Sequence, residues 1–590
     1  MIKELSDLGK MLRAQRSDND WVHDALRTEP ITIELIITTD GGFKSLQLIE
    51  KKQTIAEALT AKKGKARLLL DKAEEVLCYG GAISKNKHEL FLKKLDEFRD
   101  LPELSPVIAF YKNNRINGVE IALQAFEKAI PEEKNRKGNI GFRIQSEGLR
   151  IHEKPEVLRQ IIAKYETMQK ELLAGKNKIC AICGQNKYPV EDIPHGMIKR
   201  VPDGQSSGCA LVSYNEPAFE SYTLKGNDNS SICTNCAKTY VEGLNWLLSA
   251  GNEIVIKTKK GKEKHAYRYT NRRNFGSDTA MVFWTRKNKE LPEIDQLEAP
   301  NPDDVARLIE SVTEGKEIDT RYLEPDQFYS CTLSGSAARI AVRDWIETSL
   351  YDFRNSIAQW FKDIAIMEYD GDLKKLRTIY AGLYNLARSS QNTGNDRDVS
   401  LPRTASYLWN SAIKNTPAPL WLLTKVLQRA RLDEYGVTAE RASLIKLILN
   451  RNNKGGDFVV TEKMAEGHKP VAYVCGQIFA KLESIQYAAL GDRNAGIRER
   501  YFTYAMTLPA AAFGRLFNLH SKHFTKLKSE KAGLAITLDK ELQDLCKDVD
   551  IANFPTTFKL EEQGQFAIGY YHQKQAQFSG IKSKEQKKEA

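Results

Sequence analysis

The pattern of apolar and polar residues changes from mixed in the front half of the chain to helical in the back half. Residues 2–12 repeat isoleucine and leucine at helical spacing, which predicts an amphipathic helix. Two β-branched runs, residues 31–39 and 43–49, flank an Asp-Gly-Gly sequence at 40–42 and predict a tight antiparallel hairpin. Helical periodicity returns at residues 154–175. We therefore expect the first half to combine helices with strands.

Strand patterns become rare after Ala337. Before that point, residues 253–258 and 279–285 are rich in β-branched and aromatic side chains and predict two strands separated by a basic loop. After it, amphipathic stretches follow one another at helical period. We expect helices at residues 337–364, 375–387, 419–432 and 440–451.

A Gly/Asn-rich break at residues 450–456 is the clearest linker in the chain. The expected fold class is α+β, with a mixed α/β N-terminal half that carries a four-cysteine site and an all-helical C-terminal half. We expect an α/β N-terminal domain at residues 1–336 with zinc knuckles at 180–236, a helical middle region at 337–456, and a helical bundle at 464–590.

Composition narrows the class of protein without identifying it. The 590 residues are 41% hydrophobic and 9% aromatic, which suits several folded domains and excludes a disordered chain. An excess of 88 Lys+Arg over 77 Asp+Glu gives a net charge of +11, which permits a polyanionic partner without requiring one. The sequence has no apolar run long enough to span a membrane, about 18 residues. We expect a cytoplasmic protein that contacts no membrane.

Four of the nine cysteines form two CxxC pairs, Cys180 with Cys183 and Cys233 with Cys236. In a reducing cytoplasm, such pairs indicate metal binding before disulfides. Zinc takes four thiolates in a tetrahedron, and Gly184 lets the backbone fold back toward the metal. We predict a structural zinc site; the alternative is four reduced cysteines packed as small hydrophobic residues. The other five are expected in the core: Cys78, Cys209, Cys331, Cys475 and Cys546.

HNH endonucleases can carry a similar zinc frame, and His195 lies between the two cysteine pairs. Such a nuclease needs a general-base histidine beside a carboxylate or second histidine that holds a divalent metal. His195 is the one histidine in the sequence from 180 to 240, which favours a hydrogen-bonded or surface loop residue. The sequence also lacks phosphate-loop, HExxH and GxSxG motifs. We expect no catalytic residues and keep the zinc-framed nuclease as the alternative.

Three loops in the first half combine Lys and Arg with Gly or Asn, a composition suited to phosphate contacts and close approach to a duplex. Each alone is typical of a solvated surface, but three together favour nucleic acid. Tyr267, Tyr269 and Phe275 near the third loop are suited to stacking on an unpaired base. The candidates are Lys62, Lys63, Lys65 and Arg67; Lys112, Asn113, Asn114 and Arg115; and Lys257, Lys259, Lys260, Lys262, Lys264, Arg268, Arg272 and Arg273.

The C-terminal segment is also basic, because residues 464–590 contain 18 Lys+Arg and 14 Asp+Glu. A basic helical face can follow a single strand electrostatically without reading its sequence. The candidates for contacts with a displaced strand are Arg493, Arg498, Arg500, Arg515, Lys522, Lys526 and Lys528.

Several long strings, in the same order along the chain, resemble one protein family. They are residues 204–208 (GQSSG), 211–222 (LVSYNEPAFESY), 281–286 (MVFWTR), 328–345 (FYSCTLSGSAARIAVRDW), 440–451 (ERASLIKLILNR) and 560–573 (LEEQGQFAIGYYHQ). On these strings, the chain resembles the large subunit of the type I-C CRISPR Cascade complex over nearly its whole length.

The resemblance implies a non-enzymatic subunit of an RNA-guided DNA surveillance complex in antiviral defence. In that family, guide RNA reads the target by base pairing, and the large subunit recognises a short protospacer-adjacent motif in duplex DNA, aids R-loop formation and stabilises the displaced strand. The implied partners are guide RNA-loaded backbone subunits, the guide-processing subunit, small-subunit copies from the same gene, target double-stranded DNA and a separate helicase-nuclease.

The resemblance also assigns roles to particular residues. Motif reading is implied near residues 59–80, although relatives commonly carry Asp-Asn where this chain has Asp71 and Lys72. Many relatives have only one knuckle-like element before the GQSSG string, so the four-cysteine site is expected to be a subgroup feature that braces the following loop. The candidate motif readers are Lys62, Lys63, Lys65, Arg67 and Lys72.

Relatives also produce a small subunit from an internal start in the same gene. Met464, directly after the Gly/Asn-rich break, is the expected start here. A third interpretation of the chain is a plain scaffold whose basic loops are only solvated, and weak, salt-insensitive DNA binding by the assembled complex would favour it.

Overall fold

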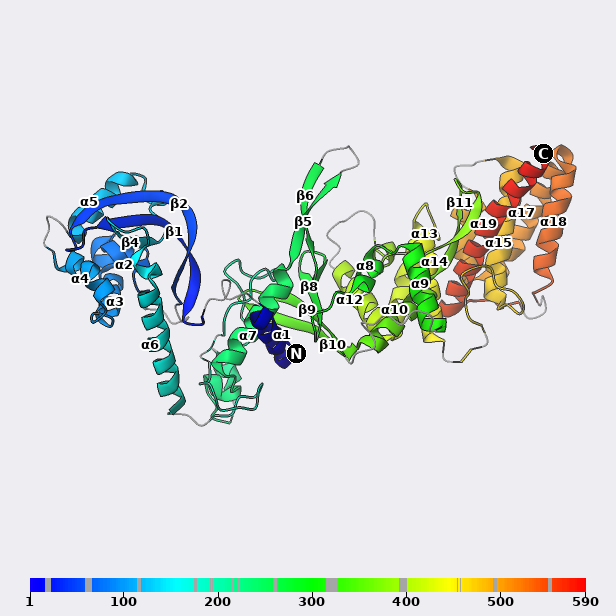
Figure 1. The fold of residues 1–590 in the computed structure, drawn as a ribbon. Helices are drawn as coiled ribbons and strands as arrows, with labels where there is room; N and C mark the ends of the chain where they lie inside the picture. Colours follow the sequence, from blue (N-terminus) through cyan, green and yellow to red (C-terminus); the bar gives the residue numbers. More distant parts are fainter. Residues whose placement is uncertain are drawn as a thin grey trace. The chain divides into compact units, whose positions relative to one another are not determined.

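A computed structural model describes residues 1–15, 23–58, 66–113, 118–174, 178–191, 193, 195–214, 216–220, 222–257, 263–314, 326–391, 400–453, 455–456, 458–491, 496–549 and 554–589. Contacts divide the chain into two compact units. Unit 1 comprises Met1–Lys199 and Ser207–Trp246, and unit 2 comprises Arg200–Ser206 and Leu247–Ala590. Figure 1 labels the elements of both units.

Unit 1 contains a four-stranded sheet in the order β2-β1-β4-β3. β1 and β2 are antiparallel, β4 is parallel to β1, and β3 is antiparallel to β4. The strands are β1 (Leu26–Ile37), β2 (Phe43–Glu57), β3 (Leu70–Asp71) and β4 (Ile140–Ile144). The helices that begin in this unit are α1 (Ile2–Gln15), α2 (Ala73–Leu77), α3 (Lys85–Asp96), α4 (Ser105–Lys112), α5 (Val119–Ala129), α6 (Pro155–Ala174) and α7 (Thr234–Ser249). One hydrophobic core contains buried residues of all five helices from α2 through α6 and of the sheet.

The hairpin and the two helices predicted for the front of the chain are confirmed as β1-β2, α1 and α6. Ile37 pairs with Phe43, and the backbone N–H of Thr38 donates to the Gly42 carbonyl at 2.9 Å to close the turn. Gly41 has a φ of +84°, and a Cβ there would lie 2.5 Å from the backbone nitrogen of Phe110. The turn therefore needs glycine both for its left-handed backbone and for its close contact with α4.

Unit 2 contains an antiparallel sheet in the order β10-β9-β8-β7 and two separate ribbons, β5-β6 and β11-β12. The strands are β5 (Gly251–Lys257), β6 (Glu263–Tyr269), β7 (Arg272–Phe275), β8 (Thr279–Thr285), β9 (Gln327–Ser336), β10 (Arg339–Ser349), β11 (Ile366–Asp370) and β12 (Lys375–Ile379). β5 and β8 confirm the strands predicted at residues 253–258 and 279–285.

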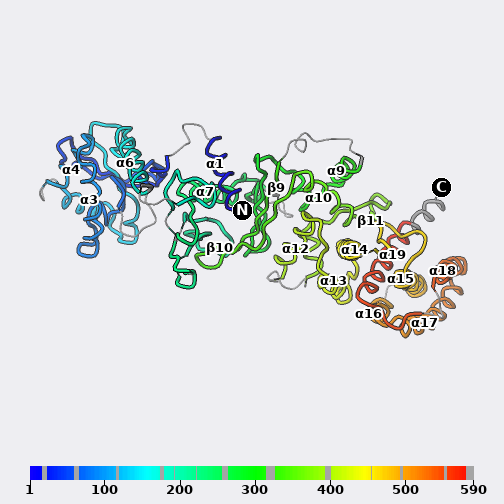
Figure 2. The backbone as a smooth tube through the Cα atoms, turned by 90° about the horizontal axis from the view of Figure 1, so that it is seen from below, coloured from blue at the N-terminus to red at the C-terminus, as the bar shows by residue number. Residues whose placement is uncertain are grey.

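The second half of the chain is helical, as predicted. The helices of unit 2, the first two of which precede this half, are α8 (Pro292–Glu298), α9 (Pro302–Glu314), α10 (Leu350–Ile364), α11 (Leu383–Ser389), α12 (Ser400–Lys414), α13 (Leu420–Leu432), α14 (Ala439–Asn452), α15 (Val471–Leu490), α16 (Ile497–Thr507), α17 (Pro509–Glu530), α18 (Ala532–Cys546) and α19 (Leu560–Glu589). Figure 2 follows the backbone through these helices. Among the described residues, no helix combines the length and apolar character needed to cross a lipid bilayer.

Two of the predicted helices are partly wrong, because each begins with a strand. Residues 337–364 form β10 and then α10, and residues 375–387 form β12 and then α11. β10 pairs with β9 from Arg339 to Ser349, with a register shift between Val342 and Asp344, so β9 satisfies most of the backbone groups on the side of β10 that faces it. The Ser349 side chain accepts a hydrogen bond from the Asp352 backbone N–H and caps α10 where the strand ends.

The Gly/Asn-rich break predicted at residues 450–456 overlaps the end of α14, which continues to Asn452, and hydrogen bonds join its two flanks. The Asn450 side chain donates to the Val460 carbonyl at 2.8 Å and accepts from the Val460 N–H at 2.9 Å. One hydrophobic core includes buried residues of the middle helices and of the terminal bundle, from Phe275 to Tyr571. The terminal bundle therefore shares its core with the middle helices in the full-length chain.

Candidate metal centre and nucleic-acid surfaces

The two cysteine pairs come together in unit 1 as predicted. The sulfur atoms of Cys180, Cys183, Cys233 and Cys236 all lie within 4.8 Å of one another, and those of Cys183 and Cys233 are 4.0 Å apart. Cys183 is half-buried and the other three are buried. Among the described residues, this is the one group of three or more His, Cys, Asp or Glu side chains placed to share a metal ion.

Local backbone geometry explains how each pair forms a tight turn. Gly184 has a φ of +68°, and its N–H donates to the Cys180 carbonyl at 2.9 Å. The Cys180 sulfur accepts hydrogen bonds from the N–H groups of Ile182 at 3.4 Å and Cys233 at 3.3 Å. The second pair begins at α7, so Cys236 lies in the first helical turn, where the helix dipole favours negative charge.

The surroundings of the thiols give them different pKa values. A hydrogen bond from Cys233, together with contacts from the Ser6 hydroxyl and Lys10 of α1, lowers the pKa of Cys236 to about 5. The same bond raises the pKa of Cys233, and burial raises that of Cys183. The hydrogen bond from Cys233 therefore favours the thiolate form of Cys236, the form in which a cysteine binds a metal.

The four thiols fit a tetrahedral zinc ion. Zinc–sulfur bonds of about 2.3 Å place tetrahedral sulfurs roughly 3.8 Å apart, close to the 4.0 Å between Cys183 and Cys233. Four thiolates would complete the zinc shell and leave no position for a substrate, so the ion would supply structural support.

His195 is buried and contacts the side chain of Tyr240. It is 2% exposed, and its Nδ1 is 2.9 Å from the Tyr240 hydroxyl. Burial lowers the pKa of His195 to about 4. The neutral imidazole thus matches the hydrogen-bonded loop histidine expected from the sequence.

The remaining cysteines form no disulfide among the described residues. Cys209, Cys331 and Cys475 are buried, whereas Cys78 and Cys546 are half-buried. Burial raises the pKa of both Cys331 and Cys475 to about 12. The core interpretation therefore fits the first three best.

The first basic loop is only partly visible, because Lys62, Lys63 and Lys65 lie outside the described residues. Arg67 is placed and is not free for phosphate. Its guanidinium donates to Glu29 at 2.8 Å, and both side chains are nearly buried. Lys72 is exposed, just before α2.

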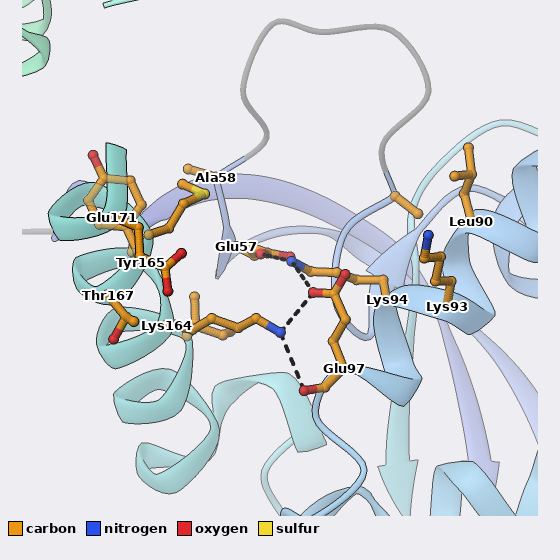
Figure 3. Close-up of a pocket in the computed structure, with 14 residues that line it drawn as sticks. Glu57, Ala58, Leu90, Lys93, Lys94, Glu97, Lys164, Tyr165, Thr167 and Glu171 are labelled. Carbon is orange, nitrogen blue, oxygen red and sulfur yellow. Dashed lines mark hydrogen bonds and ion pairs between the residues drawn. The ribbon is translucent and has the colours of Figure 1, made fainter. Parts of the chain in front are cut away.

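A cavity of about 480 Å³ opens in unit 1. Ala58 and Ala66, which flank the first basic loop, both line it. In the cavity, Glu97, which directly follows α3, lies between Lys94 of α3 at 3.6 Å and Lys164 of α6 at 2.9 Å (Figure 3). Lys94 also pairs with Glu57 at 2.6 Å. Carboxylates therefore compensate the cavity's lysines in this structure, with the exception of Lys93, which has no carboxylate within 4.0 Å among the described residues.

The second loop is likewise partly described. Lys112 ends α4, and Asn114 and Arg115 lie outside the described residues. The Asn113 amide donates to the Gly41 carbonyl at 2.9 Å. Asn113 therefore ties α4 to the β1-β2 turn rather than pointing freely toward a ligand.

In the third loop, Lys259, Lys260 and Lys262 lie outside the described residues. Arg272 is buried and donates to the carbonyls of Arg200 at 2.9 Å and Leu248 at 3.2 Å. Arg273 pairs with Asp295 at 2.5 Å and Glu298 at 3.1 Å. Both arginines hold unit 2 together, a role that sequence composition alone does not distinguish from phosphate binding.

The three aromatic residues near this loop differ in their exposure to solvent. Tyr267 is 45% exposed and meets Tyr269 edge to face at 5.0 Å between ring centroids. Phe275 is buried in the core of unit 2. Tyr267 alone of the three therefore offers a large exposed ring.

In the terminal bundle, Arg493 lies outside the described residues. Arg498 donates to the carbonyls of Asp433 at 2.7 Å and of Glu434, which fixes it against the middle helices. The other candidates are exposed: Arg500, Arg515, Lys522, Lys526 and Lys528.

Three of these cations share one face of α17. Arg515, Lys522 and Lys526 follow one another at intervals of seven and four residues, which places them in one row along a helix. A different face of α17 buries Phe513, Leu516 and other apolar residues. We call Arg515, Lys522 and Lys526 the α17 stripe.

Fold and site together define an α+β protein with a four-thiol centre in one unit and an exposed cationic helix face in the other. Residues 9–578 match the family described as CRISPR-associated protein (Cas_Csd1). The chain belongs to this CRISPR-associated family, as the resemblance of its strings predicts. Among curated proteins, none matches the chain.

Proposed function

We propose that this chain is the non-enzymatic large subunit of an RNA-guided complex that surveys DNA. The family match over residues 9–578 carries this proposal. In such a complex, base pairing reads the target sequence, while protein reads a short duplex motif and the backbone. The subunit would recognise the protospacer-adjacent motif, help open the duplex, stabilise the displaced strand and recruit a separate helicase-nuclease. Its partners would be guide RNA-loaded backbone subunits and the guide-processing subunit.

The loop between Ala58 and Ala66 is the proposed motif reader. Its lysines, Lys62, Lys63 and Lys65, come from a segment whose two ends reach one cavity of unit 1. Because Arg67 is paired with Glu29, we assign motif reading to the lysines of the loop rather than to Arg67. Lys72 is exposed and remains a further candidate.

Replacing Lys62, Lys63 and Lys65 together by Ala should weaken binding of the assembled complex to motif-bearing duplex. Electrophoretic mobility shift with motif-bearing and motif-free duplexes measures the effect, and co-purification of the partner subunits checks assembly. Arg67→Ala serves as a contrast, because loss of its bond to Glu29 should lower the thermal stability of unit 1. Unchanged affinity in the triple variant would remove the motif-reading assignment.

The four cysteines are proposed to hold a structural zinc ion. The segment between the pairs leaves unit 1 and contributes residues 200–206 to unit 2, where the Gly335 N–H donates to the Pro202 carbonyl at 2.8 Å. Zinc would fasten both ends of this excursion, which includes the GQSSG string at 204–208. A zinc ion at that position would therefore stabilise the segment structurally.

The zinc-framed nuclease is the competing function, and it predicts a different result. We expect the purified chain to leave plasmid DNA intact in the presence of Mg²⁺ or Mn²⁺, because His195 is buried against Tyr240. Agarose gel electrophoresis measures cleavage. Metal-dependent cutting that disappears in His195→Ala would establish the nuclease and overturn the non-enzymatic role.

An internal start at Met464 is proposed to yield a second product of the same gene, residues 464–590. This product would contain α15 to α19, including the α17 stripe. We expect an immunoblot against the C-terminus to show two bands in cells that express the gene, and the smaller band to vanish in Met464→Leu. Persistence of the small band in that variant would place its origin elsewhere.

A further inference from the structure

Helices α12 and α13 carry basic side chains but no acidic ones. Residues 400–432, which span both helices, contain five Lys or Arg and no Asp or Glu. Three of these cations have partners, because Lys414 pairs with Asp344 at 3.3 Å, Arg429 pairs with Asp433 at 3.0 Å, and Arg431 donates to Gln563. The other two are Arg403 and Lys425, which have no carboxylate within 4.0 Å among the described residues.

Arg403 and Lys425 each lie over an aromatic ring. The Arg403 guanidinium carbon is 5.7 Å from the centre of the Tyr407 ring, and the Lys425 nitrogen is 5.4 Å from the centre of the Trp421 ring. Each cation and its ring are four residues apart, so they occupy one face of their helix. We call Arg403, Tyr407, Trp421 and Lys425 the aromatic-basic patch.

Contacts between the two helices join these pairs into one surface. The rings of Tyr407 and Trp421 meet edge to face, with centroids 5.9 Å apart and an angle of 73°. The Lys425 ammonium donates to the Ser400 hydroxyl at 3.1 Å. An aromatic row therefore lies beside a cationic row, and the contacts between the helices limit the freedom of both rows.

The aromatic side chains of the patch remain accessible. Tyr407 and Trp421 are each 37% exposed, and the neighbouring Leu420 is 42% exposed. Burial of a large aromatic ring is favourable in free energy. An exposed pair of rings held in place by its neighbours is therefore typical of a binding surface. Nearby Trp409 of the same helix is only 2% exposed, which shows that α12 has a separate face for the core.

We propose that the aromatic-basic patch binds an unpaired nucleic-acid strand, with bases stacked on Trp421 and Tyr407 and phosphates beside Arg403 and Lys425. Aromatic platforms lined by cations bind single strands in this way, with little sequence preference. The absence of carboxylates from residues 400–432 gives the patch the charge that a phosphodiester chain requires. This proposal rests on the proposed function, because duplex opening supplies the unpaired strand.

The direct test measures binding of fluorescein-labelled oligo-dT and oligo-U to the full-length chain by fluorescence anisotropy. The double variant Tyr407→Ala with Trp421→Ala should weaken binding by about ten-fold or more. Trp421→Phe should retain most of the affinity, because a ring remains. Tyr351→Ala, which removes a 65% exposed ring from α10, should leave the affinity unchanged. Equal affinity in the double variant and the wild type would overturn the proposal.

A second experiment, on the assembled complex, determines whether the bound strand is DNA or guide RNA. 5-Iodouracil is placed either in the non-target strand of the DNA or in the guide RNA, and cross-linked peptides are mapped by mass spectrometry. A cross-link to Tyr407 or Trp421 from either strand supports the proposal and identifies its occupant. Loss of a partner subunit from the double variant, with unchanged oligonucleotide binding, would instead make the patch a protein interface and overturn it. Intact motif-dependent duplex binding in that variant would show that the proposed function stands by itself.

Discussion

The Cys233→Ser variant should purify without zinc and lose the cooperative unfolding of unit 1. The Cys233 sulfur is buried within 4.8 Å of the other three, so the hydroxyl would leave three thiolates around the ion. Structural zinc binds zinc-finger peptides with about 10–16 kcal/mol, comparable to the whole stability of a domain. Elemental analysis measures zinc per chain, and circular dichroism measures thermal unfolding.

Cys78→Ser is the matched control for this experiment. Cys78 is half-buried, and its thiol makes only a 3.8 Å contact with the Gly81 carbonyl. The same chemical change there should alter the unfolding free energy by no more than about 0.5 kcal/mol and leave the zinc content unchanged. If Cys233→Ser retained one zinc per chain and the wild-type midpoint, the ion would not depend on Cys233 and the four-cysteine site would be overturned. A wild-type chain that purified without zinc would make the cysteines ordinary core residues.

Charge reversal of the α17 stripe should remove most of the affinity for single-stranded DNA that the terminal bundle contributes. The variant replaces Arg515, Lys522 and Lys526 with Glu. Each phosphate contact on a single strand contributes about 0.7 to the slope of log affinity against log salt, so three lost contacts lower the slope by about 2. At about 0.1 M salt, the same loss corresponds to an affinity change on the order of a hundred-fold. Anisotropy titrations of the full-length chain at several salt concentrations measure both quantities.

The control for the α17 stripe changes the net charge equally but at scattered positions. Lys531, Lys540 and Lys559 are exposed in the same bundle, and replacing all three with Glu tests the effect of charge alone. We expect this variant to keep at least most of the wild-type salt slope. Equal losses in the two variants would show that net charge, rather than the row on α17, attracts the strand.

Features set by neighbouring residues were predictable from the sequence. The Asp-Gly-Gly turn, α6 and the two cysteine turns depend on contacts within a few residues, such as the Gly184 N–H bond to Cys180. Residues 339–349 were not predictable, because their pairing partner, β9, determines their conformation. Their amphipathic composition suits either a helix or a half-buried strand, and tertiary pairing decides between them.

Candidate binding residues were harder to predict than elements. A charged side chain in a basic sequence can contact phosphate or bond within the protein, and only the folded environment distinguishes the two. Arg67, Arg272, Arg273 and Arg498 all bond to protein groups. The aromatic-basic patch was missed for the opposite reason, since Tyr407 and Trp421 are typical of a helix core until their exposure is known. The lack of acidic residues from 400 to 432 was the signal available in the sequence.

The close pairing of α15 and α19 has a consequence for synthesis of the chain. Gly476 of α15 lies where a Cβ would be 2.0 Å from the Phe566 carbonyl oxygen, and Gly569 of α19 lies equally close to the Tyr473 carbonyl oxygen. These partners are separated by the whole of α16, α17 and α18. During translation, the faces of α14 and α15 that contact α19 therefore stay uncovered until α19 follows, although other helices already pack on both. This interval exposes apolar surface to which a chaperone can bind.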